Sequence, residues 1–339
     1  MDNYSPLVSV HMITYNHAPY ISRAIEGVLA QKTDFEFELV IGEDCSTDGT
    51  REIALAYQEA HPERVRVITS EKNVGMHANA KRTMDACRGR FIAWCEGDDY
   101  WHREDKLQRQ VDYLLNHPDC GLVYTDYDCR WVVGGRLIRA FNRSHGLVPP
   151  DNPTMSDLLF KRCGIFTCTV CARLDLVREV YADLAADQDS SRFLMGDTQV
   201  WAGVLTKSRL HYLADSFATH NVLQESAAHS QSPLRQQKYY VSKGELLVHL
   251  ARKYGLPQEE IEVLEHDLAD AQLVLAFLVA DRELAQSAWQ RLTRKGIGRR
   301  LLLLGVQYRP LYAVVSRLRE FKQGLSSGRR ASVAAEASG

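Results

Sequence analysis

The sequence predicts an α/β fold, in which a Rossmann-like, mostly parallel β-sheet is followed by a helical C-terminal extension. Apolar segments of strand length alternate with segments of helical periodicity through the first third of the chain, which is typical of βαβ units. From about Leu234 onward the pattern is helical, with Pro257 between two long helices. We therefore expect a sheet-containing domain over 1–230, a helical region over 231–325 and a disordered tail over 326–339.

The expected elements of the first domain follow one another in a regular order. Strands are expected at residues 7–13, 37–42, 65–68 and 91–95, with helices around 24–29, 53–57 and 78–87. Beyond residue 120 we expect strands at 121–124 and 166–172, a hairpin turn at 132–136 and a helix that begins near 196–198. Right-handed crossovers bring the carboxyl ends of parallel strands to one edge, so the polar segments 14–15, 43–44 and 96–99 should converge on one cleft.

Length, composition and charge narrow the class of protein. The 339 residues are 45% hydrophobic and 25% charged with a formal net charge of -2, which argues against a disordered chain and against a dedicated nucleic-acid binder. The N-terminal segment lacks the basic and apolar parts of a secretory signal, and no apolar run approaches the roughly 20 residues that span a bilayer. The eight cysteines are scattered and fit reduced, buried thiols. We therefore expect a cytoplasmic protein.

A cluster of carboxylates follows the apolar strand expected at 91–95. Glu96, Asp98 and Asp99 lie within four positions, and carboxylates this close repel one another unless a cation lies between them. Hydrated Mg²⁺ or Mn²⁺ is the usual cation at such a cluster. The alternative is an acidic turn that caps the following helix, and this segment alone leaves both interpretations open.

Four motifs occur in an order that is typical of one enzyme family. They are V-S-V-H-M-I-T-Y-N at 8–16, E-D-C-S-T-D-G-T at 43–50, E-G-D-D-Y-W at 96–101 and M-G-D-T-Q-V-W at 195–201. Over about residues 6–230 the chain resembles the family 2 glycosyltransferases, the large inverting group with the A-type glycosyltransferase fold. The resemblance implies transfer of a sugar from a nucleoside diphosphate sugar to an acceptor hydroxyl.

The resemblance also implies roles for the residues of these motifs. Asp98 would be the metal ligand, for Mg²⁺ or Mn²⁺, and Asp197 the general base that activates the acceptor hydroxyl. Asp44 would accept a hydrogen bond from N3–H of uracil or thymine, because a carboxylate accepts and cannot donate. The residues that would bind the donor are Thr14, Tyr15, Asn16, Asp44, Asn73, Lys81, Glu96, Gly97 and Asp99.

Several of these residues also have a structural interpretation. Asp44 and Asp48 could cap the helix that begins near Thr50, and Asp197 could cap the helix that follows it. Lys81 and the neighbouring arginine could form a solvated helix face instead of reaching the diphosphate or ribose. The sequence alone leaves these alternatives open.

Two positions depart from the family pattern. Glu96 replaces the usual aspartate at the first acidic position, and residues 219–221 read Thr-His-Asn where many relatives carry an arginine. The loss of that arginine puts a diphosphate clamp at this point in doubt. His11, His77 and His220 have no metal-ligand spacing between them, so we expect structural roles for all three.

The C-terminal region carries a basic and partly apolar segment. Residues 291–330 hold eleven Lys and Arg against Glu320 alone, and 299–322 contains leucine runs between arginines. Basic amphipathic segments of this kind lie on anionic membrane surfaces, which predicts peripheral association at the inner face of the membrane. The alternative is a helix that packs its leucines on the catalytic domain.

The sequence as a whole predicts a metal-dependent, inverting glycosyltransferase. Its donor would be a UDP- or dTDP-sugar and its acceptor a hydroxyl of a glycan or lipid-linked intermediate, as in cell-surface polysaccharide synthesis; no nucleic-acid partner is expected. A sugar nucleotidyltransferase is an alternative, but it predicts a Gly-rich basic loop after the first strand, where this chain has Thr-Tyr-Asn-His at 14–17. A non-catalytic nucleotide-sugar or glycan-binding module is the other alternative, and it predicts that Asp197 is dispensable.

Overall fold

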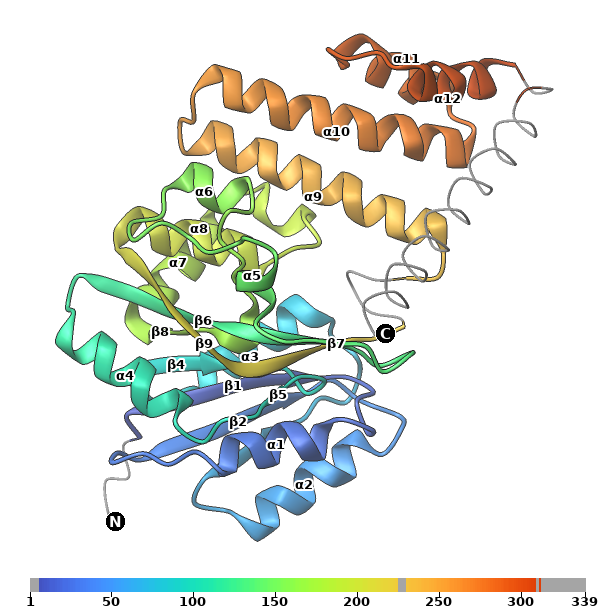
Figure 1. The fold of residues 1–339 in the computed structure, drawn as a ribbon. Helices are drawn as coiled ribbons and strands as arrows, with labels where there is room; N and C mark the ends of the chain where they lie inside the picture. The colour runs from blue at the N-terminus through green and yellow to red at the C-terminus, as the bar shows by residue number, and fades with distance from the viewer. Residues whose placement is uncertain (1–5, 225–229, 309–310, 312–339) are drawn as a thin grey trace, which may run out of the picture. The chain divides into compact units, whose positions relative to one another are not determined.

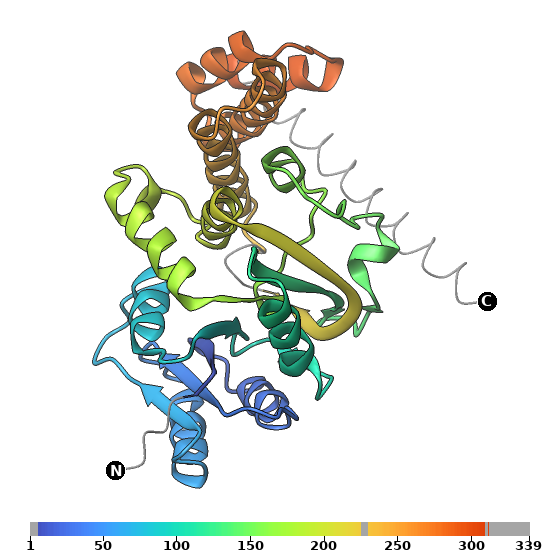
Figure 2. The same cartoon turned by 90° about the vertical axis from the view of Figure 1, so that its left-hand side faces the viewer.

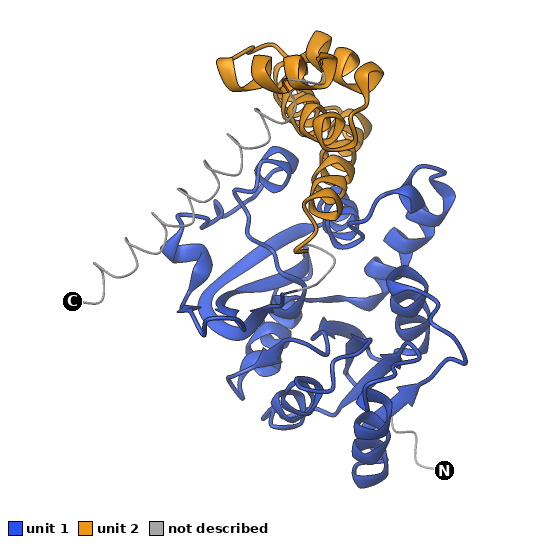
Figure 3. Ribbon diagram, turned by 90° about the vertical axis from the view of Figure 1, so that its right-hand side faces the viewer, with its two compact units in different colours: residues 1–229 blue, residues 230–339 orange. Residues whose placement is uncertain are grey.

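The computed structural model describes residues 6–224, 230–308 and 311, and it divides into two compact units, residues 1–229 and 230–339 (Figure 3). The tail predicted at 326–339 lies outside the described residues, as do 309, 310 and 312–325. Unit 1 contains the predicted sheet and unit 2 is helical over its described residues, so the predicted α/β class with a helical C-terminal region is confirmed.

Unit 1 is built from alternating strands and helices (Figure 1). Its strands are β1 (Val8–Thr14), β2 (Phe37–Glu43), β3 (Val65–Ile68), β4 (Phe91–Trp94), β5 (Tyr100–Trp101), β6 (Cys120–Trp131), β7 (Leu137–Ile138), β8 (Cys171–Arg173) and β9 (Arg209–Val222). Its helices are α1 (Ile21–Leu29), α2 (Thr50–Ala60), α3 (Met76–Ala86), α4 (Lys106–Asn116), α5 (Phe141–Ser144), α6 (Met155–Leu159), α7 (Leu174–Ala186) and α8 (Asp197–Lys207), with 3-10 turns η1 (Thr167–Thr169) and η2 (Ser190–Arg192).

The strands form one mostly parallel sheet in the order β3-β2-β1-β4-β8-β6-β9-β5, with β7 paired to β6. β1 runs parallel to both β2 and β4, and β2 runs parallel to β3. β6 and β9 are also parallel, and Figures 1 and 2 show these two segments side by side although they lie far apart in the sequence. β8 is antiparallel to β4 and β6, and β5 is antiparallel to β9.

The central strands are nearly continuous apolar runs because both faces of the sheet are covered there. Every residue of β2 is buried, as is all of β1 except Ile13. α1 buries one stripe, formed by Ile21, Ala24, Ile25 and Val28, against this core. These buried elements hold the carboxyl ends of β1, β2 and β4 at one edge of the sheet.

One predicted element differs from the structure. We expected a strand over 166–172, but residues 167–169 form the 3-10 turn η1, and only Cys171–Arg173 form β8. The Thr169 hydroxyl donates to the Phe166 carbonyl at 2.6 Å, and the Trp101 indole N–H donates to the Cys168 carbonyl at 2.9 Å. Side-chain hydrogen bonds thus hold this segment in a turn.

Unit 2 contains four described helices. They are α9 (Pro233–Lys253), α10 (Gln258–Val279), α11 (Arg282–Arg291) and α12 (Ile297–Gln307). Pro257 lies between the two long helices as predicted, at the N-cap of α10. One hydrophobic core joins α10, α11 and α12, and it is made by Ala269, Leu273, Ala276, Phe277, Ala285, Ala288, Leu292 and Val306. No described helix is both long enough and apolar enough to cross a membrane.

Candidate active site

Three loops meet where β1, β2 and β4 end. The Asp44 backbone N–H donates to the Thr14 carbonyl at 3.1 Å, and the Gly97 N–H donates to the Ile13 carbonyl at 3.0 Å. Asn16 joins the first two loops a second time, because its side-chain oxygen accepts from the Thr47 N–H at 2.9 Å. The predicted polar segments therefore lie together at one edge of the sheet.

The carboxylates after β4 lie close together, and the protein offsets their negative charge only in part, through His220. Burial, and after it the neighbouring Asp99 and Asp98 carboxylates, raise the pKa of Glu96 to about 8. Burial also raises the pKa of Asp98, against the opposing effect of His17, whose Nε2 lies 3.9 Å from an Asp98 oxygen. Glu96 Oε2 is buried without a hydrogen-bond partner among the described residues. Such a cluster fits a divalent cation, because a cation would offset the repulsion between the carboxylates and would give Glu96 Oε2 a partner.

The Asp99 carboxylate, unlike those of Glu96 and Asp98, is held by hydrogen bonds to other described residues. Its carboxylate lies 3.1 Å from His220 Nδ1 and accepts from the Asn221 N–H at 2.8 Å. Burial opposes a charged His220, but Asp99, Asp98 and Glu96 outweigh it and raise the pKa of His220 to about 9. His220 therefore places a positive charge beside the cluster, at the position where the sequence lacks the arginine of many relatives.

The sequence did not predict the contacts of His17 and His220 with the cluster. His17 lies in the loop between β1 and α1, and His220 lies on β9, 121 residues beyond Asp99. The available signal for His220 was its position in the Thr-His-Asn segment, where a different cation was expected.

Gly97 allows the cluster to approach β1 closely. A Cβ atom at this position would lie 2.6 Å from Thr14 Oγ1 and 3.1 Å from His17 Nδ1. Thr14 is buried, and its hydroxyl has no hydrogen-bond partner within the described ranges. The Thr14 hydroxyl and Glu96 Oε2 are thus two buried polar atoms that a bound ligand could satisfy.

Asp44 does not cap helix α2. Its carboxylate is buried and accepts from the backbone N–H groups of Val74 and Gly75 at 2.8 and 3.0 Å. The N-cap of α2 is Gly49, and Asp48, one residue before it, accepts from the Thr50 N–H at 3.1 Å. A carboxylate has about four acceptor sites, so Asp44 retains capacity for a donor on a ligand.

The remaining predicted donor-binding residues lie around this edge of the sheet and differ in exposure and in their hydrogen-bond partners. Tyr15 is exposed, and the Asn73 side chain accepts from the Gly75 N–H at 3.0 Å. Lys81 pairs with Asp85 on an exposed face of α3 at 2.6 Å. Arg82 donates to Asn79 and to the backbone carbonyls of Thr69 and Glu43, which ties α3 to the ends of β2 and β3.

Asp197 is the first residue of α8, and its Oδ1 accepts from the Thr198 N–H at 2.7 Å. Burial raises its pKa above the usual range for an aspartate. No hydrogen bond or ion pair among the described residues joins it to the carboxylate cluster. Two packing contacts connect α8 to that edge of the sheet: Trp201 packs edge-to-face on Trp94 with ring centroids 5.4 Å apart, and a Cβ at Gly196 would lie 3.2 Å from the His77 ring of α3.

The described residues contain no group of three or more His, Cys, Asp or Glu arranged to hold a metal ion. Mg²⁺ is usually held by one or two carboxylates together with substrate phosphates and water. Asp98 and Glu96 are the side chains that fit such a role, because both carboxylates lack a hydrogen-bonded cation of the protein.

The sheet order and the helical C-terminal region define the fold as A-type glycosyltransferase. Two solved structures share it: Staphylococcus aureus TarS 1-349 in complex with UDP-GlcNAc (TM-score 0.52, 16% identity, 92% of this chain and 91% of that chain) and the mannosyltransferase PcManGT from Pyrobaculum calidifontis in complex with GDP-Man and Mn2+ (TM-score 0.51, 17% identity, 93% and 84%). At these identities the likeness shows the fold alone.

The sequence model of glycosyl transferase family 2 matches residues 9–173 of this chain. An uncharacterised protein of Mycobacterium tuberculosis is 44% identical over 112 residues, which are 33% of this chain and 32% of that protein. The putative teichuronic acid biosynthesis glycosyltransferase TuaG of Bacillus subtilis is 26% identical over 71% of this chain and 89% of its own length. The Escherichia coli glucosyltransferase WfgD, which acts on alpha-D-GlcNAc-diphosphoundecaprenol, is 32% identical over 50% of this chain and 60% of its own length. The chain thus spans about a third of the length of the first of these relatives.

Proposed function

We propose that this protein is an inverting glycosyltransferase that moves a sugar from a UDP-sugar to a hydroxyl of a glycan or lipid-linked acceptor in polysaccharide synthesis. The observation that carries the proposal is the buried carboxylate cluster of Glu96, Asp98 and Asp99 at the edge where the three loops meet. The match to the family 2 model supports it, as do the relatives named for teichuronic acid synthesis and for glucosyl transfer to a diphosphoundecaprenol acceptor.

The donor would bind across the ends of β1 and β2. The Asp44 carboxylate, held by two backbone N–H groups, accepts the N3–H of uracil, which favours uridine over cytidine because cytosine lacks that proton. Thr14 and Tyr15 pack the base and ribose, and the Thr14 hydroxyl gains a partner on binding. UDP-GlcNAc in the TarS complex and UDP-Glc in the name of WfgD support a uridine donor over a thymidine one.

Asp98 and Glu96 would hold Mg²⁺ or Mn²⁺ with the donor diphosphate. A bound divalent ion stabilises the negative charge that develops on the leaving diphosphate. The Mn2+ complex of the mannosyltransferase with the same fold supports such a cofactor. Asp99 and His220 keep the loop in place, because their contact joins the end of β4 to β9. Asp197, with its raised pKa, takes the proton of the acceptor hydroxyl.

Substitution of Asp197 tests the assigned base against a purely structural cap. Asp175 is a matched control, because it lies in the first turn of α7 and its Oδ1 accepts from the Leu176 N–H at 2.8 Å, as Asp197 accepts from Thr198. Asp197→Asn should lower the rate of transfer at least about 100-fold, the usual contribution of a general base, while UDP still binds. Asp175→Asn should leave the rate within about twofold. The measurement is transfer from UDP-sugars found in a thermal-stabilisation screen. Near-normal transfer by Asp197→Asn would contradict the role of general base and would leave Asp197 with a structural role in the first turn of α8.

We further propose that α12 lies on an anionic membrane surface. One side of the helix packs into the core of unit 2 through Leu302, Leu303 and Val306. Another side is apolar but exposed, with a spacing of three and four residues, and basic residues flank it. The exposed apolar residues are Ile297, Leu301, Leu304 and Tyr308, and the flanking exposed basic residues are Arg294, Lys295 and Arg300. A membrane position would bring the protein to a lipid-linked acceptor.

A further inference from the structure

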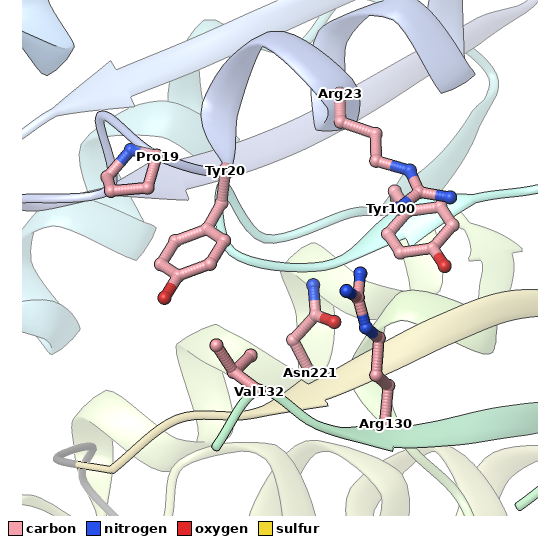
Figure 4. Close-up of a pocket in the computed structure, with 7 residues that line it drawn as sticks. All are labelled: Pro19, Tyr20, Arg23, Tyr100, Arg130, Val132 and Asn221. Atoms are coloured by element: carbon pink, nitrogen blue, oxygen red, sulfur yellow. The ribbon is translucent and has the colours of Figure 1, made fainter. Parts of the chain in front are cut away.

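A small cavity of about 180 Å³ lies beside the carboxylate cluster but contains none of its carboxylates (Figure 4). Its walls come from the first turn of α1, from β5 and from the ends of β6 and β9. Two links place it next to the cluster: Tyr100 directly follows Asp99, and the Asn221 side chain donates to the Asp98 carbonyl at 2.5 Å.

Two arginines converge on this cavity. The guanidinium of Arg23 lies over the ring of Tyr100, 3.5 Å from its centroid, and Arg130 is the β6 residue in register with Asn221 of β9. Figure 4 shows the guanidinium of Arg130 extending toward Asn221 and Tyr100. Within the described ranges neither arginine forms an ion pair with a carboxylate. Two guanidinium groups that line one cavity and form no ion pair of their own favour an anion between them, because the planar N–H fork matches carboxylate and phosphate oxygens.

Asn221 adds an acceptor to the two positive groups. Its side chain is buried, with 5% of the residue exposed, and its Nδ2 is used by the Asp98 carbonyl. Its Oδ1 has no hydrogen-bond partner among the described residues. A buried amide oxygen requires a donor, which the anion itself cannot supply but a hydroxyl next to the anion can. The cavity therefore fits an anionic group on a hydroxylated molecule.

The size of the cavity limits what it can hold. Pockets that enclose a whole drug-sized ligand measure about 300–1,000 Å³, so 180 Å³ fits one anionic group with its neighbouring hydroxyl and excludes a complete nucleotide sugar. The donor diphosphate would bind at the carboxylate cluster only with a cation between the like charges. The cavity has arginines in place of carboxylates, so an anion binds here directly and without a metal.

We propose that this cavity is an anion subsite for the glycosyl acceptor. Arg23 and Arg130 bind a phosphate or carboxylate group of the acceptor, and Asn221 Oδ1 accepts from an adjacent sugar hydroxyl. The assignment to the acceptor rests on the proposed glycosyl transfer. It gives the enzyme a preference for acceptors that carry a negative charge close to the reacting sugar.

The experiment titrates the full-length protein with inorganic phosphate and, separately, with D-glucuronate, in the presence of saturating UDP and Mg²⁺. The variants are Arg23→Gln and Arg130→Gln. Arg64→Gln is the control, because it makes the same change in charge beside β3 at the opposite edge of the sheet. At least one probe should bind while UDP is bound, and each cavity variant should weaken that binding at least about tenfold, the range for charge-assisted hydrogen bonds. UDP affinity should stay within about twofold in all three variants, which also reports that they are folded.

Three other outcomes would each overturn the subsite. Binding that is insensitive to Arg23→Gln and Arg130→Gln would mean an adventitious ion only. Competition between the probe and UDP, with weaker UDP binding by both variants, would assign the arginines to the donor diphosphate. Absence of binding by either probe would also refute it. Failure of the wild type to bind UDP would contradict the proposed function instead, and the phosphate titration repeated without UDP would still test the cavity.

Discussion

At the scale of single residues, Gly97 shows how closely the carboxylate cluster and β1 must approach. Gly97→Ala would place a methyl group 2.6 Å from Thr14 Oγ1 and 2.8 Å from Thr14 Cβ, both inside van der Waals contact. Because Thr14 lies on a buried strand, the loop and not the strand must move. We expect a loss of about 1–3 kcal/mol in the free energy of unfolding and weaker UDP binding, measured by denaturant titration and by UDP titration.

Gly298→Ala is the matched control for this prediction. A Cβ at Gly298 meets no heavy atom within 4 Å, and the residue lies inside helix α12. Alanine is a better helix former than glycine by about 1 kcal/mol, so this variant should be more stable than the wild type and bind UDP normally. If Gly97→Ala behaves in the same way, the close approach of the loop to β1 has no functional consequence.

Single residues also mark the limit of what the sequence could predict at the site. The carboxylates after β4 and the polar end of β1 were predictable, because apolar strands end there and their order fixes where the ends meet. The pairing of Asp99 with His220 was not predictable, because it joins residues 121 positions apart through the β5–β9 pairing. The different hydrogen bonds of Asp44 and Asp48 could not be predicted for a similar reason. The backbone N–H groups that donate to Asp44 belong to the loop before α3, about 30 residues further along the chain.

At the scale of an element, helix α4 begins with a fully buried lysine. The ammonium of Lys106 donates to Gln110 at 2.7 Å and lies 4.2 Å from the centroid of the Trp101 ring. Burial lowers the pKa of Lys106 to about 8, and Cys171, Cys95 and Cys168, all with raised pKa values of their own, oppose this only in part. The amphipathic pattern of the helix did not predict that a charged residue would lie on its buried face.

The lowered pKa of Lys106 gives the stability of the protein a pH dependence. The folded pKa of about 8 lies below the ordinary lysine value of 10.5, so the unfolded chain binds more protons between these values and stability rises with pH across that window. Below pH 8 the full cost of about 3 kcal/mol is present. Lys106→Met should abolish the rise, whereas Lys72→Met, at an exposed loop position, should retain it. Denaturant unfolding at pH 7 to 10.5 measures this, and equal slopes in the wild type and Lys106→Met would contradict it.

At the scale of the whole molecule, the sequence predicted the order of elements better than their lengths. The βαβ repeats were visible because β1 and β2 are buried on both faces, and the long helices of unit 2 were visible from their periodicity. The antiparallel strand β8 was predicted too long. Trp101 donates to the Cys168 carbonyl and Thr169 to the Phe166 carbonyl, and these hydrogen bonds hold the residues before β8 in a turn. Sequence patterns report burial along a segment, whereas such contacts depend on the assembled sheet.

The exposed apolar side of α12 predicts how the whole protein distributes between solution and membrane. The double variant Ile297→Ser/Leu301→Ser should reduce binding to vesicles of phosphatidylglycerol and phosphatidylcholine at least about tenfold, since each buried aliphatic side chain contributes about 1.5–3 kcal/mol. Val263→Ser/Val279→Ser, at exposed positions of α10 in the same unit, should bind as the wild type does. Binding of the wild type should also fall as salt is raised, because Arg294, Lys295 and Arg300 are exposed to the anionic surface. Vesicle co-sedimentation measures both effects.

Equal losses in the two double variants would mean that apolar exposure in general, and not helix α12, governs binding to the vesicles. Binding that does not change with salt would mean that the basic residues do not contribute to the interaction.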